Sequence, residues 1–95
     1  MEQPEFYIRR AETIMRNIRR NTPPALGRRK SCETAIFNYA VFILAISLSR
    51  RDNPLYNADN EQARINDIKA VYKQHRTGKL ACTKAMTRLC EVFNR

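Results

Sequence analysis

Apolar residues recur along the chain in four stretches, and three of these have the spacing of an amphipathic helix. In residues 4–21 apolar side chains return every three or four positions, and residues 59–77 and 82–95 repeat this pattern. Such a period places the apolar side chains on one face of a helix. The stripes consist of Tyr7, Ile8, Ala11, Ile14, Met15 and Ile18 in the first stretch, Ile65, Ile68, Val71 and Tyr72 in the second, and Cys82, Ala85, Met86, Leu89, Cys90 and Phe93 in the third. We therefore predict three helices that each pack one face against a core.

The fourth stretch, residues 35–48, is apolar at all but two positions. It has 14 residues, whereas a helix needs about 20 such residues to cross a bilayer. Basic residues flank both of its ends, so no membrane orientation is indicated. We interpret it as a buried central helix of about residues 33–50, with Ser31 as its N-cap and no membrane insertion. A homodimer interface and contact with a membrane are the alternatives to burial inside the domain.

Turn-forming residues separate the four stretches. Two prolines follow the first, an Asn-Pro pair follows the central run, and Gly78 divides the last two. Asp59 and Gln62 have the spacing of a capping box and predict the start of the third helix. The predicted fold is therefore all-α, a single compact four-helix domain of residues 1–95. Its last two helices are expected to form an antiparallel hairpin, because the linker between them is short.

Net charge is the property that departs furthest from an ordinary globular protein. The chain has 18 basic residues against 9 acidic ones, which gives a net charge of +9. Residues 6–30 contain eight of the basic residues and a single acidic residue, Glu12. Arginine outnumbers lysine thirteen to five, and its planar guanidinium suits bidentate contacts with phosphate. These features favour a polyanionic partner.

The first predicted helix carries its arginines on the side opposite its apolar stripe. Arg9, Arg16 and Arg20 fall within about 40° of one another, and Arg19 lies beside them. The aromatic residues lie mostly in the predicted core stripes, which argues against base stacking on single strands. We therefore predict a non-enzymatic protein that binds nucleic acid, duplex RNA or DNA, mainly through phosphate contacts. The candidate binding residues are Arg9, Arg16, Arg19, Arg20, Arg28, Arg29, Lys30, Arg50 and Arg51.

Other uses of a basic face compete with this interpretation. The main alternative is a small interaction or inhibitor protein that docks its basic face on an acidic protein surface. The simplest alternative is that the basic face binds no partner and only keeps the protein soluble. A helix-turn-helix DNA-binding motif formed by the last two helices is a weaker alternative, because the last helix would present only a modest surface for contacts with base edges.

Residues that support catalysis or bind a cofactor are few. His75 is the single histidine, and no phosphate-binding loop, dinucleotide-binding or metalloprotease motif occurs. A general base needs a partner within hydrogen-bond reach, and the sequence offers His75 none. We expect no enzymatic activity and no cofactor. We also expect no metal site, because zinc in a structural site takes four ligands.

The three cysteines, Cys32, Cys82 and Cys90, include no closely spaced pair. On one helix Cys82 and Cys90 would lie about 12 Å apart along the axis, which is too far for a disulfide. The N-terminal residues show no apolar segment of a secretory signal. We therefore expect buried, reduced thiols and a cytoplasmic or nuclear location.

Overall fold

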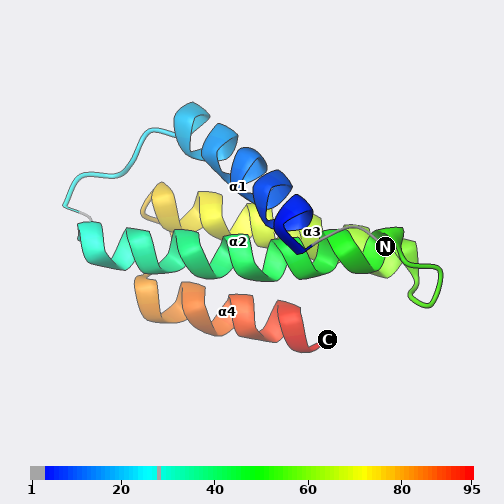
Figure 1. Cartoon of the computed structure of the whole chain (residues 1–95). Coiled ribbons are helices and arrows are strands. Elements are labelled where there is room, and N and C mark those ends of the chain that lie inside the picture. The colour runs from blue at the N-terminus through cyan, green and yellow to red at the C-terminus, as the bar shows by residue number, and fades with distance from the viewer. Residues whose placement is uncertain (1–3, 28) are drawn as a thin grey trace.

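Four helices make up the regular structure of the described residues, which are 4–27 and 29–95 of this computed structural model. They are α1 (Pro4–Asn21), α2 (Lys30–Asp52), α3 (Ala58–Arg76) and α4 (Cys82–Asn94). Figure 1 shows α2 through the middle of the molecule, with α1 and α3 on one side of it and α4 on the other. Helix α2 contacts all three of its neighbours, whereas α1 and α4 do not contact each other within the described part of the chain. The prediction of an all-α four-helix domain with a central apolar helix is confirmed.

Helix α1 forms where its apolar stripe predicts it. Glu5 stands in the first turn and Arg19 and Arg20 stand in the last, so both ends complement the helix dipole. The helix ends before the Pro-Pro pair, where the residue preceding a proline avoids the helical region. The buried stripe residues are Tyr7, Ala11 and Met15, with Ile14 and Ile18 packed at the edge of the core. Ile8 was expected in this stripe, but 41% of it is exposed.

Helix α2 is longer than the expected helix of residues 33–50. It begins at Lys30, directly after Arg29 in the cap position, so the predicted Ser31 N-cap is wrong. No side chain caps this end. At the other end the backbone N–H of Asn53 donates to the carbonyl of Arg50. The helix is therefore five residues longer than predicted, and three of the five, Lys30, Arg51 and Asp52, are charged.

The central helix is buried on most sides but not on all of them. Its buried residues are Ile36, Phe37, Ala40, Val41, Ile43, Leu44, Ala45, Ser47 and Leu48. Phe42, in contrast, is 57% exposed, which corrects the expectation that the helix is covered all round. The physical reason is that α1 and α4 do not meet, so three neighbours leave one strip of α2 open. Phe42 lines a groove of about 430 Å³ there, together with Ile8 and Tyr56.

By length and composition alone, α2 also qualifies as a helix that crosses a membrane. Half of its most apolar part is buried among the other helices. Central helices of soluble proteins pass the same test, because they too are apolar on most sides. The packing against three neighbours accounts for the buried half of this apolar part.

Helices α3 and α4 form the predicted hairpin and run in opposite directions (Figure 1). The N-cap of α3 is Asn57, whose side chain accepts a hydrogen bond of 3.1 Å from the backbone N–H of Asn60. The capping box predicted at Asp59 and Gln62 is therefore wrong by two residues. The stop predicted at Gly78 is confirmed, since this residue has a φ of 84°, a conformation that glycine adopts without a Cβ clash.

Candidate nucleic-acid interface

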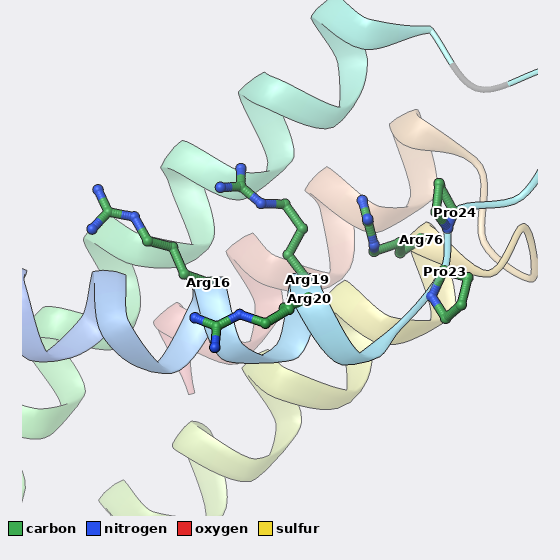
Figure 2. A pocket seen from close by; sticks show the side chains of 6 residues that line it. All are labelled: Arg16, Arg19, Arg20, Pro23, Pro24 and Arg76. Atoms are coloured by element: carbon green, nitrogen blue, oxygen red, sulfur yellow. The ribbon is translucent and has the colours of Figure 1, made fainter.

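Four arginine side chains from two helices gather where α1 ends. Figure 2 shows Arg16, Arg19 and Arg20 on the last turns of α1, with Arg76 of α3 beside the segment that follows. These side chains line an open hollow of about 550 Å³. Its remaining lining residues are Pro23 and Pro24. The hollow is therefore lined by four arginines and bordered by the stiff Pro-Pro segment.

The arginines on the outer face of α1 are exposed and have little to compensate their charge. Arg9, Arg16 and Arg20 are all exposed, as the helical spacing predicts. Arg16 donates a hydrogen bond of 2.7 Å to Glu12, one turn earlier in the same helix. Exposed ion pairs of this kind contribute about 0–1 kcal/mol, so an external anion can displace Glu12 at small cost. The side chains of Arg9 and Arg20 form no hydrogen bond or ion pair with residues 4–27 and 29–95.

Arg19 turns toward α2 instead of outward. Its guanidinium carbon lies 4.4 Å from the centre of the Phe37 ring, a cation–π contact. Phe37 is buried and belongs to α2. The contact leaves the hydrogen-bond donors of Arg19 available while it fixes the side chain at the inner edge of the hollow.

Arg76 has a structural role in the same hollow. Its side chain is only 12% exposed, forms an ion pair with Glu33 and donates to the carbonyl of Thr22. Its own carbonyl accepts a hydrogen bond of 2.8 Å from the N–H of Ala25. Arg76 therefore ties the end of α3 to the first turn of α2 and to the segment after α1. Sequence analysis missed this residue, because nothing in the local spacing shows that it faces α1.

Tyr72 belongs to the same network, one turn before Arg76. Its hydroxyl donates to the Glu33 carboxylate at 3.3 Å, and burial, followed by the nearby Glu33 charge, raises the pKa of Tyr72 to about 12. The unfolded pKa is about 10, so the contribution of neutral Tyr72 to stability is present below pH 10 and lost as the pH rises toward 12.

We predict that Tyr72→Phe lowers the pH dependence of the unfolding free energy between pH 10 and pH 12. Denaturant unfolding of the parent and the variant at both ends of the window measures this, and equal slopes would contradict it.

The remaining predicted binding residues lie in two separate places. Arg29 and Lys30 are exposed at the start of α2, and Arg28 lies outside the described residues. Arg50 and Arg51 lie at the other end of α2, about 30 Å away along the helix axis. The nine predicted residues therefore do not form one continuous site.

Both arginines at the far end of α2 make contacts within the protein. The Arg50 guanidinium lies 5.3 Å from the Tyr56 ring centre and 5.6 Å from that of Phe93. Arg51 donates a 2.9 Å hydrogen bond to Gln62. These contacts hold the α2–α3 loop, α3 and α4 against the end of α2, so the group at the end of α1 is the stronger candidate for binding.

No family model, curated protein or solved structure matches this chain.

The aromatic residues follow the sequence prediction only in part. Tyr7, Phe37 and Tyr72 are buried, whereas Phe42 and Tyr56 are exposed along the groove between α1 and α2. The hollow at the end of α1 has no aromatic lining residue. Phosphate contacts therefore remain the mode of binding that suits the arginines there.

The expectation of three separate buried thiols is wrong. Cys32 of α2 and Cys82 of α4 are joined as a disulfide, and the buried His75 of α3 lies against them. Cys90 is exposed, with its sulfur 3.3 Å from the Tyr39 hydroxyl. The hydrogen bond with Cys90, followed by burial, raises the pKa of Tyr39. Sequence analysis missed the pairing because residues 32 and 82 are 50 positions apart.

Proposed function

We propose that the protein binds nucleic-acid duplexes through their phosphates and performs no catalysis. The observation that carries this proposal is the set of exposed arginines on the outer face of α1, Arg9, Arg16 and Arg20, beside the arginine-lined hollow. We call Arg9, Arg16, Arg19 and Arg20 the α1 arginine surface. Arg9, Arg16 and Arg20 lie on the outer face of one helix, and Arg19 lies at the inner edge of the hollow. Glu12 is the single acidic residue between Arg9 and Arg20.

The dimensions of α1 suit a phosphate backbone. From Arg9 to Arg20 the helix rises about 16 Å, and a duplex carries one phosphate charge per about 1.7 Å of its axis. Each arginine can therefore meet a different phosphate without bending the nucleic acid. Arg29 and Lys30, exposed at the start of α2, can add contacts from the same end of the molecule. Because such contacts touch no base edge, we expect little dependence on base sequence.

The hollow would bind a single phosphate group. Arg16, Arg19 and Arg20 line it from α1, and guanidinium groups bind phosphate oxygens through paired hydrogen bonds. Arg76 contributes positive charge at its edge while it remains paired with Glu33. The hollow would thus anchor one phosphate, and Arg9 would contact the backbone further along.

The experiment that tests this function is a binding titration over a range of salt concentrations. We expect the parent protein to bind duplex DNA with an affinity that falls with log salt at a slope of about −4 to −5. Each neutralised phosphate contributes about −0.9, so this slope corresponds to about five contacts. Duplex RNA and single strands, tested in the same filter-binding assay, identify the preferred form. No detectable duplex binding at low salt would refute the proposal.

A second candidate function is docking on an acidic protein surface. The observation that favours it is the groove between α1 and α2, where Phe42 and Tyr56 are exposed beside Arg50. Protein interfaces are enriched in aromatic residues and arginine. In that case the protein would act as a small interaction or inhibitor module, and its basic face would set orientation and association rate.

A further inference from the structure

Three potential metal ligands from three helices meet at one end of the molecule. Cys32 lies in the first turn of α2, His75 in the last turn of α3, and Cys82 is the first residue of α4. Their sulfur and ring nitrogen atoms all lie within 4.8 Å of one another. The Cα atoms of Cys32 and Cys82 are 6.2 Å apart, and the Cys32 sulfur lies 3.5 Å from Nε2 of His75.

These donors and separations suit zinc. Zinc takes thiolate sulfur at about 2.3 Å and imidazole nitrogen at about 2.0–2.1 Å in tetrahedral geometry, which places neighbouring ligand atoms roughly 3.5–3.8 Å apart. The distance between Cys32 and His75 already falls in this range. Thiolate and imidazole donors also disfavour magnesium and calcium, which prefer oxygen. His75 is fully buried, so its ring is held in place by the core.

We propose that Cys32, His75 and Cys82 bind one zinc ion when the thiols are reduced, and that oxidation of these thiols to the Cys32–Cys82 disulfide releases the ion. Among the described residues the cluster supplies three ligand atoms, so a water molecule would complete the tetrahedron. Both cysteines are only partly buried, which gives water and an oxidant access to the sulfurs.

The release step is balanced with hydrogen peroxide as the oxidant. The two thiolates lose two electrons and form the S–S bond. The O–O bond of the peroxide takes up these electrons and breaks, which yields two hydroxide ions. The zinc ion leaves because disulfide sulfurs carry no charge and are poor ligands, and His75 alone does not hold it.

The cluster would join three helices close to the α1 arginine surface. His75 immediately precedes Arg76, and Cys32 immediately precedes Glu33, the two partners of the ion pair beside the hollow. Both the zinc-bound and the disulfide form add a bond between α2 and α4 to the packing of these helices, whereas the reduced form without metal has the packing alone. The chain can therefore keep this end of the bundle closed under reducing and oxidising conditions.

The test uses the full chain carrying Cys90→Ser, which leaves only the two cysteines of the cluster. We expect the reduced protein to bind one Zn²⁺ per chain in competition with a chromophoric chelator. With Co²⁺ in place of zinc, we expect a thiolate-to-cobalt charge-transfer band. Addition of Cys32→Ser should weaken binding at least tenfold, and hydrogen peroxide should release one Zn²⁺ as two thiols disappear.

Two results would overturn the proposal. One is reduced protein that binds no Zn²⁺ and shows no thiolate-to-cobalt band, a result that does not depend on any cluster variant folding. The other is binding that Cys32→Ser leaves unchanged, with circular dichroism as the check that the helices persist. Zinc retained after both thiols have been oxidised would overturn the release step. None of these outcomes involves nucleic acid, so the zinc site and the proposed function are tested independently.

Discussion

Replacing Ile43 by alanine is expected to lower the free energy of unfolding by about 2–5 kcal/mol. Ile43 is fully buried in the middle of α2, where the core packs around it. The loss combines the transfer free energy of the deleted methyl and methylene groups with the cavity they leave. For a domain of this size such a change is a large part of the total stability. Denaturant unfolding followed by circular dichroism measures it.

The adjacent residue provides a matched control. Phe42 is larger than Ile43, but 57% of it is exposed in the strip of α2 that the neighbouring helices leave open. We expect Phe42→Ala to cost about 1 kcal/mol or less, because most of its ring surface is already in contact with water. Equal losses for the two variants would show that the open strip is covered in solution, for example by a second copy of the chain.

Periodicity allowed the amphipathic helices to be predicted well. Helix α4 was expected over residues 82–95 and is observed over Cys82–Asn94. Helix α1 was equally clear, because a 3.6-residue period defines both the helix and its buried side. The starts of α2 and α3 were less accurate. Several residues near each start can cap a helix, and tertiary contacts decide among them.

The open side of α2 could not be predicted. A run that is apolar all round has no preferred face, so the sequence offers no signal for which residue remains exposed. That choice depends on where α1 and α4 pack, and these two helices do not meet. Phe42 and Ile43 are adjacent and both apolar, and the direction in which each side chain leaves the helix makes one exposed and the other buried.

The candidate site was predicted in part. Helical spacing correctly placed Arg9, Arg16 and Arg20 on an exposed face. The role of Arg76 depends on contacts with residues 43 and 54 positions away, which no local pattern reveals. The same limitation hid the cluster of Cys32, His75 and Cys82. The sequence feature that could have indicated this cluster is a histidine near the end of one helix followed by a cysteine at the start of the next.

The largest effect on binding is expected from removing two arginines of the α1 arginine surface. We predict that Arg16→Ala combined with Arg20→Ala weakens duplex binding at low salt and makes the salt slope less steep by about 2. Each lost phosphate contact removes about 0.9 from the slope. Neither side chain is buried, and Arg16 loses only an exposed ion pair with Glu12. Helical content should therefore stay the same, and the loss should be similar for all duplex sequences.

Conservative replacements distinguish the two candidate functions. Lysine keeps the charge but not the planar fork of arginine. We expect Arg16→Lys with Arg20→Lys to retain most of the salt dependence and lose part of the affinity for duplexes. A protein interface that uses bidentate arginine–carboxylate pairs would tolerate this change poorly.

The most direct test compares the salt slopes of two double variants on the same duplex DNA. The first is Arg16→Ala with Arg20→Ala, and the control is Lys84→Ala with Arg88→Ala, an exposed pair with the same spacing on α4. Both lower the net charge from +9 to +7, so overall charge is matched. We predict a slope less steep by about 2 for the α1 variant and an unchanged slope for the α4 control. Equal slopes for the two variants, or an α1 variant that keeps the parent's slope, would contradict phosphate binding by the α1 arginine surface.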